Sequence, residues 1–502
     1  MIFPSLEEAK KIITEGDYRR IPIAYEIMSD IKTPVEVLKI LKNKSKHCFM
    51  LESVEDLKRW GRYSILGFDP ILEIICENEF LQINEYSDSK GTENKNILSK
   101  KTKNPGKYIK KILSENKSPN LANLPPFTGG LVGYFAFDYI KYSEPSLNFL
   151  INSIKNEESF KDVDLMLFDK VIVFDNYKQK MIIIINIKTE NIEKEYEKAI
   201  FELVNLIDLI EKGKPIDEVK NRLKLKTDFK PLYSKEKYSA MVKRAKNYIK
   251  EGDIFQVVLS NPISSDIEGS LLDTYRILRT TNPSPYMFYF SSDDIEIAGA
   301  SPETLVKLHD GNLYTFPLAG TRPRGENDIE DKKFEEELLS DEKELAEHNM
   351  LVDLGRNDIG KVAEFGSIKL EKYLSIEKFS HVMHIGSTIK GKLRKDKDFL
   401  DVIDAILPAG TLSGAPKIRA CEIINELENN KRGIYGGAIG YISLSGNLDT
   451  CIAIRIAFSK NNKVFIRSGA GIVADSIPDV EFEECMNKAK AVIAALKSAE
   501  NI

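Results

Sequence analysis

Glu347 is the residue whose setting most strongly suggests chemistry. The sequence around it predicts a helix over 341–354, with the Asp341 carboxylate capping the first turn and Gly355 ending the last. Apolar residues follow Glu347 at three, four and seven positions, so we expect it on the buried face of this helix. A buried carboxylate is costly unless a positive group meets it. An ion pair with a Lys or Arg, or ligation of a metal ion, would satisfy it.

A second group of acids opens the last predicted helix, which begins at Pro478. Glu481, Glu483 and Glu484 fill its first two turns, where acids complement the helix dipole without any further role. The preceding segment, 468–473, consists of small residues and predicts a turn after a strand. Such backbone is either a plain tight turn or a place where N–H groups approach an anion.

Two further segments and one histidine carry polar candidates. Arg322 and Arg324 stand between glycines, where guanidinium groups can fork onto carboxylates. Residues 410–417 resemble a phosphate loop, but the spacing is short and a proline precedes the lysine, so a nucleotide site is weakly supported. His384 alternates with apolar residues as in a half-buried strand. It is either a satisfied core histidine or a group that handles protons.

Composition excludes several classes of protein. The 502 residues allow two or three domains or one large intertwined pair, and the net charge of −5 leaves no basic footprint for nucleic acid or a membrane surface. The five cysteines show no paired spacing, so neither a zinc site nor a disulfide framework is indicated. With no signal-peptide pattern and no apolar run of membrane-spanning length, we expect a cytoplasmic protein without nucleic-acid or membrane partners.

The order of the predicted elements indicates the fold class. Strands come in runs rather than in strict alternation with helices, which favours an α+β fold. Residues 165–174 and 181–187 predict the two strands of a hairpin. The charged segment 212–230 contains a proline and is the expected linker, which divides the chain into an N-terminal domain, 1–211, and a C-terminal domain, 231–502.

As a set, the motifs resemble the chorismate-utilising enzymes, and within that family the branch that forms anthranilate. The resemblance covers about 230–495 and rests on residues 300–303, 317–325, the helix through Asp358, 410–417, 433–437, 449–455 and 469–471. The N-terminal half resembles the more variable regulatory domain of the family, chiefly at 51–53 and 62–67. This likeness implies a two-domain α+β fold in which β-sheets pack against helices in a layered sandwich.

The same resemblance implies a reaction and a set of site residues. Chorismate and ammonia would give anthranilate and pyruvate, with Glu347 and Glu484 holding Mg²⁺ as a Lewis acid and template against the ring carboxylate. Glu303 would protonate the departing 4-hydroxyl, and His384 would assist elimination of the enolpyruvyl group. Gln256 and Thr411 belong to the same catalytic group. The implied substrate-binding residues are Gly320, Thr321, Tyr435, Arg455, Gly469, Ala470 and Gly471.

Two positions distinguish the branches of the family. Relatives that add water carry a basic lysine where this chain has Gln256, and relatives that make aminodeoxychorismate carry a lysine in place of Ala319. Both residues favour anthranilate formation. An aminodeoxychorismate-forming enzyme is the nearest alternative, and a non-catalytic amino-acid-binding paralogue is the alternative from another class. The acids Glu303, Glu347 and Glu484 argue against the second.

The resemblance also implies regulation and a partner. L-Tryptophan would be a feedback inhibitor, and the implied inhibitor-binding residues are Glu52, Ser53, Asn282, Pro285, Tyr286 and Met287. By composition alone these residues are a strand end and a Pro-rich turn. No cysteine is flanked by glycines as a glutaminase nucleophile would require, and no length remains for such a domain. We therefore expect a hetero-oligomer with a separate glutamine amidotransferase subunit that supplies ammonia.

Overall fold

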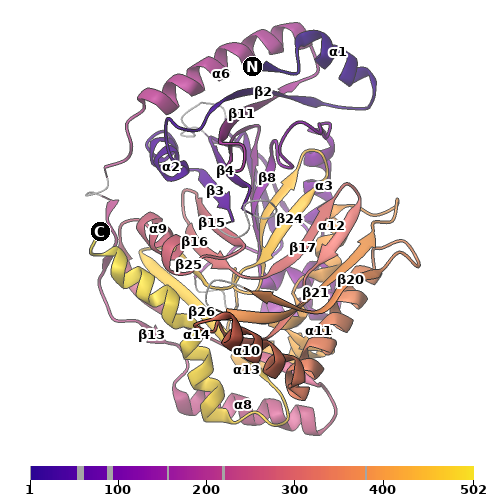
Figure 1. Ribbon diagram of the computed structural model, residues 1–502, viewed down its shortest axis with the longest axis vertical. Coiled ribbons are helices and arrows are strands. Elements are labelled where there is room, and N and C mark those ends of the chain that lie inside the picture. The colour runs from indigo at the N-terminus through magenta and orange to yellow at the C-terminus, as the bar shows by residue number, and fades with distance from the viewer. Residues whose placement is uncertain (1, 54–60, 87–93, 155–157, 218–220, 379–381) are drawn as a thin grey trace.

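Two large antiparallel sheets form the centre of the computed structural model, which describes residues 2–53, 61–86, 94–154, 158–217, 221–378 and 382–502 (Figure 1). In pairing order, the first sheet contains β1 (Ile2–Phe3), β2 (Arg20–Met28), β11 (Lys180–Lys188), β10 (Lys170–Asp175), β4 (Tyr63–Phe68), β3 (Cys48–Glu52), β15 (Tyr286–Ser291), β16 (Glu296–Ser301), β25 (Ile456–Lys460), β26 (Lys463–Ile472), β14 (Gln256–Glu268) and β12 (Lys224–Leu225), and β13 (Lys230–Pro231) and β22 (Gly414–Ala415) also pair with β14.

The second sheet is built in the same antiparallel way. Its strands, in order, are β19 (Leu318–Pro323), β21 (Val382–Lys392), β18 (Asn312–Thr315), β17 (Thr304–His309), β24 (Leu448–Ile452), β23 (Ala438–Ser443), β8 (Gly130–Phe135), β9 (Val163–Phe168), β5 (Leu72–Glu77), β6 (Phe80–Tyr86) and β7 (Asn94–Lys101), and β20 (Lys369–Lys378) pairs with β21.

Apolar side chains hold the two sheets face to face. The core between them includes Phe49 and Phe288 from the first sheet and Tyr134, Phe168 and Ile439 from the second, all buried. Since alternate residues of a strand point to opposite faces, the other face of each sheet is left for helices. The expected layered α+β sandwich is confirmed.

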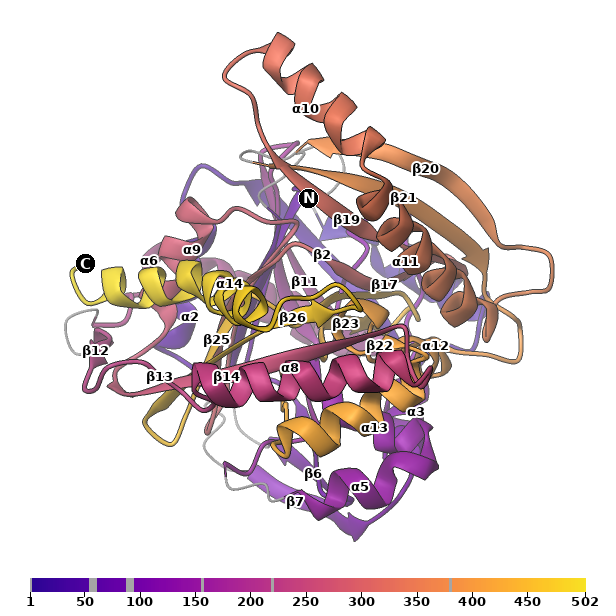
Figure 2. The ribbon, with the colours of Figure 1, turned by 90° about the horizontal axis from the view of Figure 1, so that it is seen from below.

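Helices cover the outer faces. Those on the first sheet are α1 (Leu6–Thr14), α2 (Pro34–Lys42), α6 (Ile192–Lys212), α9 (Leu272–Thr281) and α14 (Pro478–Ala499), and those on the second are α3 (Gly106–Ser114), α11 (Glu342–Gly360) and α12 (Phe399–Ile406). A smaller core joins β14 and β26 to α5 (Asn148–Ser153), α8 (Lys235–Lys250) and α13 (Lys417–Glu428), seen from below in Figure 2. The short helices are η1 (Phe137–Tyr139), α4 (Ile140–Ser143), η2 (Pro145–Leu147) and η3 (Gly410–Leu412), and α10 (Asp328–Ser340) precedes α11.

Both sheets combine strands from either side of the expected linker. In the first sheet β3 pairs with β15, with Met50 opposite Tyr289. In the second, β8 pairs with β23, with Gly133 opposite Gly440. The two halves of the sequence therefore share one set of sheets, and the division at 211 and 231 stays a prediction. Among the described helices, none is long and apolar enough to cross a membrane.

The predicted hairpin is confirmed in part. Strands β10 and β11 pair as expected, with Phe174 opposite Met181. The first predicted strand, 165–174, is wrong as a single element, because the chain leaves the second sheet after Phe168 and enters the first at Lys170. Asp169 is the single residue between β9 and β10. Its backbone carbonyl accepts the N–H of Asn186, and its carboxylate lies near the Arg20 guanidinium group. Two buried strands in succession read as one apolar run, which periodicity cannot divide.

The helix that carries Glu347 begins as predicted and ends later. The Asp341 carboxylate accepts the backbone N–H groups of Lys343 and Glu344, as expected of a cap. The helix does not stop at Gly355 but continues to Gly360. A Cβ at Gly355 would lie 2.8 Å from the Ile389 side chain. Glycine is needed there for the close approach of α11 to β21, not for a turn.

Candidate active site

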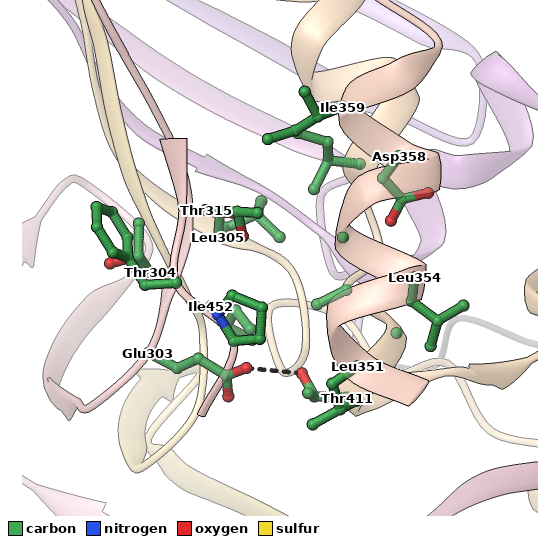
Figure 3. A pocket seen from close by; sticks show the side chains of 16 residues that line it. Glu303, Thr304, Leu305, Thr315, Leu351, Leu354, Asp358, Ile359, Thr411 and Ile452 are labelled. Carbon is green, nitrogen blue, oxygen red and sulfur yellow. Dashed lines mark hydrogen bonds between the residues drawn. The ribbon is translucent and has the colours of Figure 1, made fainter. Parts of the chain in front are cut away.

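Glu303 occupies the short connection between β16 and β17. Its backbone carbonyl accepts the N–H of Ile452 at 2.9 Å, and the Ser301 hydroxyl donates to the Ile452 carbonyl at 2.7 Å. These two bonds to Ile452 of β24 fix the backbone that carries the carboxyl group. The Thr411 hydroxyl, from η3, donates to Glu303 Oε1 at 3.0 Å (Figure 3). The structure therefore brings together two of the predicted catalytic residues, which are 108 positions apart in the chain.

Glu303 and Thr411 line a cavity of about 40 Å³. Its walls come from β17, from the segment after β18, from α11 and from η3, and most of them are apolar. Figure 3 shows Asp358 on the same wall as Leu351 and Leu354, higher on α11 than the Glu303–Thr411 contact. A cavity of this size has room for roughly one small molecule such as water.

The Glu303 carboxyl group titrates near neutral pH. Burial raises its pKa to about 7, while the Thr411 hydroxyl and the charges of Arg455 and Lys488 act in the opposite direction. Desolvation is the largest of these effects and therefore prevails. A carboxylic acid with such a pKa can hold a proton at neutral pH and release it to a leaving group.

His384 on β21 is joined to two other predicted residues. Its Nδ1 lies 2.7 Å from the backbone carbonyl oxygen of Gly320 and 3.1 Å from the Thr321 hydroxyl. Because a carbonyl oxygen only accepts, Nδ1 carries the proton and Nε2 is the basic nitrogen of the neutral ring. Burial lowers the pKa of His384, so the ring is neutral at physiological pH. The proton-handling role stays a prediction, and the geometry permits it.

The arginines of the 320–325 segment fork onto carboxylates, as expected, but these are carboxylates of the chain itself. Arg324 donates through Nε and Nη2 to Asp331, and Arg322 donates to Asp341 at 2.9 Å. Residues 320–323 belong to strand β19, and Arg324 and Gly325 follow it. The register of β19 with β21 shifts between Ala319 and Arg322, and Gly320 there has a φ of +66°. That irregularity turns the Gly320 carbonyl toward His384.

The segment 469–471 is part of strand β26, so the predicted turn is wrong. It pairs with β14 along its length, and the intervening alanine is buried in the core shared with α8 and α13. The two glycines leave room for neighbouring side chains. A Cβ at Gly469 would lie 3.1 Å from the Tyr435 hydroxyl, and one at Gly471 would lie 2.7 Å from Gln256 Nε2. The strand is glycine-rich because these two predicted site residues lie directly over it.

Arg455 supplies the positive charge of this region. Its backbone is left-handed, with φ of +52°, where the chain leaves β24 and enters β25. The side chain is exposed, and its charge lowers the pKa of both Glu303 and His384. Arg455 therefore lies within electrostatic reach of the predicted acid and of the predicted elimination residue. A substrate carboxylate at this point would meet a guanidinium group of suitable geometry.

Glu347 does not lie on the buried face of its helix, contrary to the expectation. The buried residues of α11 are His348, Leu351, Val352, Asp358 and Ile359, and Glu347 is exposed. The apolar spacing extends to Glu347 in the sequence, but the helix is rotated so that His348 contacts Ser387 of β21 instead. Solvent reaches the Glu347 carboxylate, yet enough protein surrounds it for desolvation to raise its pKa.

Glu347 of α11 lies within electrostatic reach of Glu484 of α14. The pKa of Glu347 is raised by burial, and the charges of Glu344 and Glu484 add to this, while Lys343 and Lys488 oppose it. Lys488 is 2.7 Å from Glu484 on the same helix. No cluster of three His, Cys, Asp or Glu groups suited to a metal ion occurs in the described ranges. Two carboxylates this close suit a hard cation that takes its other ligands from water and substrate.

The predicted inhibitor residues gather elsewhere, at a cavity of about 150 Å³ between the two sheets. Five of the six line it, namely Glu52, Ser53, Pro285, Tyr286 and Met287. The sixth, Asn282, caps the C-terminus of α9 and lies outside the lining. The Glu52 carboxylate is occupied by the chain itself, because Tyr275, Arg279 and Ser64 all donate to it.

The sequence reasoning missed the other wall of this cavity. It is formed by Ile439 and Tyr441 of β23 and by Asp449 and Cys451 of β24, pairs two residues apart as on one face of a strand. The sequence shows this alternation, but no local sequence signal places these strands beside residues 51–53. Tyr286 donates to Asp449 at 2.8 Å and accepts from Thr304, the residue after Glu303.

In residues 410–417, the lysine that a phosphate loop would direct at a nucleotide is engaged within the chain. The Lys417 ammonium group donates to Asp358 and to the Ile406 carbonyl, each at 2.8 Å. A lysine held in this way is not directed at a nucleotide. Sequence reasoning did not identify the Asp358–Lys417 pair, because the partners are 59 residues apart and neither stands out locally.

Comparison with known proteins places this site in a family. A family model described as "chorismate binding enzyme" matches residues 46–494, so the chain belongs to that family. Its full-length relatives include anthranilate synthase component 1 of Acetivibrio thermocellus, 44% identical with 100% of both chains covered. The protein of the same name from Aquifex aeolicus is 44% identical over 99% of this chain and 98% of its own.

Solved structures agree with this assignment. Anthranilate synthase component I from Streptococcus pneumoniae superposes with a TM-score of 0.72 at 37% identity, covering 93% of this chain and 98% of that one. The menaquinone-specific isochorismate synthase of Escherichia coli shares the fold, with a TM-score of 0.68 at 18% identity over 98% of each chain. The predicted resemblance to the chorismate-utilising enzymes is confirmed.

Proposed function

We propose that this chain is the chorismate-converting subunit of an anthranilate synthase, which turns chorismate and ammonia into anthranilate, pyruvate and water. The observation that carries the proposal is Glu303, a half-buried carboxyl group with a pKa of about 7, placed with Thr411 within electrostatic reach of Arg455. Full-length relatives named anthranilate synthase component 1 support the choice of reaction.

The first half of the reaction assigns a proton to Glu303. The nitrogen of ammonia forms a bond to ring carbon C2, the ring double bonds shift, and the bond between C4 and its hydroxyl oxygen breaks. Protonated Glu303 gives its proton to that oxygen, which leaves as water. Thr411 holds the carboxyl group in place through its 3.0 Å hydrogen bond. Arg455 is the guanidinium group available for a substrate carboxylate.

The second half removes pyruvate. A proton leaves C2, the bond between ring carbon C3 and the enolpyruvyl oxygen breaks, and the side chain departs as pyruvate once it gains a proton, which leaves an aromatic ring. His384 is the group proposed to assist this elimination, because its neutral ring presents a basic Nε2 while Nδ1 is held by Gly320. The buried Tyr435 and the glycines of β26 would form the surface on which the ring lies.

A divalent cation fits the carboxylates of α11 and α14. Glu347 and Glu484 would hold Mg²⁺, and the ion would supply Lewis-acid polarisation and orientation of a substrate carboxylate. The support is electrostatic, because the charge of Glu484 is among the groups that raise the pKa of Glu347. A bound cation would offset that repulsion.

The nucleophile is inferred to be ammonia because the chain has glutamine rather than lysine at position 256. Gln256 lies against Gly471 and cannot take a proton from water, whereas ammonia is already nucleophilic. Ala319 on β19 is buried and offers no amine for covalent attack on the ring, as aminodeoxychorismate formation would require. Ammonia is proposed to come from glutamine through a separate amidotransferase subunit.

The cavity between the sheets is proposed to bind L-tryptophan as a feedback inhibitor. Its lining combines apolar surface from Met287 and Ile439 with the charges of Lys307 and Asp449, which suits an amino acid with a large apolar side chain. Ile439→Phe fills part of this cavity. We expect at least a tenfold weaker inhibition by tryptophan, with the uninhibited rate within twofold, measured as anthranilate formation. Equal inhibition of the variant would contradict the site.

A fluorescence assay tests the catalytic proposal. Purified protein is mixed with chorismate, ammonium at alkaline pH and Mg²⁺, and anthranilate emission is followed, with samples lacking either ammonium or Mg²⁺ as controls. We expect emission only in the complete mixture. Absence of anthranilate at high ammonium would overturn the proposal, and emission without ammonium would overturn the role of ammonia.

A further inference from the structure

A buried ion pair lies close to the proposed acid and has no part in the reaction described above. Asp358, in the last turns of α11, lines the same cavity as Glu303 and Thr411 (Figure 3). Lys417, the first residue of α13, donates from Nζ to Asp358 Oδ2 at 2.8 Å. Their side chains are only 9% and 11% exposed. Burying two charges costs desolvation energy that a pair of apolar side chains would avoid.

The ion pair lies where the two ends of the segment that carries Thr411 meet. Lys417 Nζ also donates to the carbonyl of Ile406 at 2.8 Å, so one end of segment 406–417 is bonded to the other. The 3-10 helix η3, with Thr411 at its centre, lies between these two ends. A second lysine, Lys361, lies 3.5 Å from Asp358 Oδ1 and donates to the Ala405 carbonyl at 3.3 Å. Asp358 thereby anchors both ends of the segment to α11.

We propose that Asp358 and Lys417 are positioning residues that hold the Thr411 hydroxyl on Glu303. The inference rests on the proposed function, in which Glu303 is the general acid. Helix α11 serves as the fixed point: it bears Asp358 near its end and packs against β19 and β21 along its length. If the pair is broken, segment 406–417 is freed from that helix. The 3.0 Å bond from Thr411 to Glu303 then loses its support.

The consequence is a change in the proton affinity of Glu303. The groups that act on it are the Thr411 hydroxyl and the charges of Arg455 and Lys488, all of which lower its pKa against the effect of burial. Removing the Thr411 hydrogen bond therefore raises the pKa. Because a general acid works in its protonated form, the high-pH limb of kcat/KM moves to higher pH. Hydrogen bonds to charged groups predict a shift of about one pH unit.

The test compares pH profiles of kcat/KM for chorismate at a constant concentration of free ammonia. The variants are Thr411→Val, Lys417→Met, Asp358→Asn and the double variant Thr411→Val/Lys417→Met, with Glu303→Gln to test the acid itself. Arg419→Met is the matched control. Arg419 lies on helix α13, as Lys417 does, and makes a 2.7 Å ion pair with Asp253, but it does not line the cavity. Thr411→Ser keeps the hydroxyl and should keep the profile.

We expect Glu303→Gln to lose at least 100-fold in activity. Thr411→Val should move the high-pH limb upward by about one unit, and Lys417→Met and Asp358→Asn by at least half of that. The double variant should move it no further than Thr411→Val alone, because the pair acts through Thr411. Arg419→Met should leave the limb unchanged.

Other outcomes separate the two claims. If Glu303→Gln is inactive while Lys417→Met and Asp358→Asn leave the limb in place, or add to the shift of Thr411→Val, the positioning role is overturned and the acid stands. If Glu303→Gln retains activity, the proposed function of Glu303 fails. Circular dichroism identifies a variant that does not fold. If Lys417→Met does not fold, Asp358→Asn, which keeps the size of the side chain, decides the positioning role by itself.

Discussion

Two glutamates show how partners decide what a carboxyl group can do. Glu428 is enclosed and accepts hydrogen bonds from Arg432 and Arg467 at 2.6 and 2.7 Å, which lower its pKa despite burial. Glu303 is held by a neutral hydroxyl, and burial raises its pKa to about 7. The first is a permanent anion that ties strands together. The second can exchange a proton near neutral pH, which is the property the proposed reaction needs.

Stability should respond to Glu303 in a pH-dependent way. Its pKa is about 7 in the folded protein against an ordinary value of 4.5, so between these values the folded state keeps a proton that the unfolded chain releases. Stability attributable to this group is present below pH 4.5 and is lost as pH rises through 7. Glu303→Gln removes the titration. Its Tm should exceed that of the unchanged protein by a few degrees at pH 8 and match it near pH 4.

Glu428→Gln is the control for that measurement. It removes a carboxylate whose pKa is lowered, and it leaves Arg432 and Arg467 buried beside a neutral group. We expect a lower Tm at pH 8, opposite in sign to Glu303→Gln. A Glu303→Gln variant that is equally or less stable at pH 8 would contradict the pKa assigned to Glu303.

At the scale of elements, α11 and α14 bring together acids from positions 347 and 484. Each helix is held to the body through its buried face, and both carboxylates are exposed. Lys343 and Lys488 offset part of the negative charge. The arrangement suits a cation that is bound together with its substrate rather than permanently.

Removing either carboxylate should weaken Mg²⁺ binding. Glu347→Gln and Glu484→Gln are expected to raise the Mg²⁺ concentration for half-maximal activity at least tenfold, and to reduce the rise in Tm on adding Mg²⁺ with chorismate. Glu483→Gln changes an acid one residue away that pairs with Lys235 on the other side of α14, and it should behave as the unchanged protein. Normal Mg²⁺ dependence in either variant would exclude that residue as a ligand.

The elements also show where sequence reasoning ends. Runs of strands and the Asp341 cap were readable locally, and the structure agrees with them. The role of Glu303 came from the family resemblance and stays a prediction. The segment 469–471 was read as a turn because small residues favour turns, yet it is a strand that Tyr435 and Gln256 cover. Long-range partners such as Asp358 and Lys417 leave no local signal. Only the fold brings them together.

At the scale of the molecule, the sheets bind the two halves of the sequence into one folding unit. The pairs β3–β15 and β8–β23 are internal to the sheets, so cutting the chain at the expected linker would expose long unpaired edges. The apolar core between the sheets likewise draws side chains from both halves.

This sharing predicts cooperative unfolding. Calorimetry of the whole chain should give one transition, and residues 1–211 or 231–502 expressed alone should be insoluble or lack the whole protein's near-ultraviolet circular dichroism. Co-expression of the two fragments is the control, since their strands can still pair. Two independent transitions, or a fragment that folds alone with native dichroism, would contradict a shared core.

The central claim is that this chain joins ammonia to chorismate and releases pyruvate, and product analysis tests it most directly. Chorismate is incubated with the protein, Mg²⁺ and ¹⁵N-labelled ammonium, and the products are identified by mass spectrometry. The account predicts ¹⁵N-anthranilate and pyruvate in equal amounts. An unlabelled isomer of chorismate, or an aminated product that keeps its enolpyruvyl group, would contradict it.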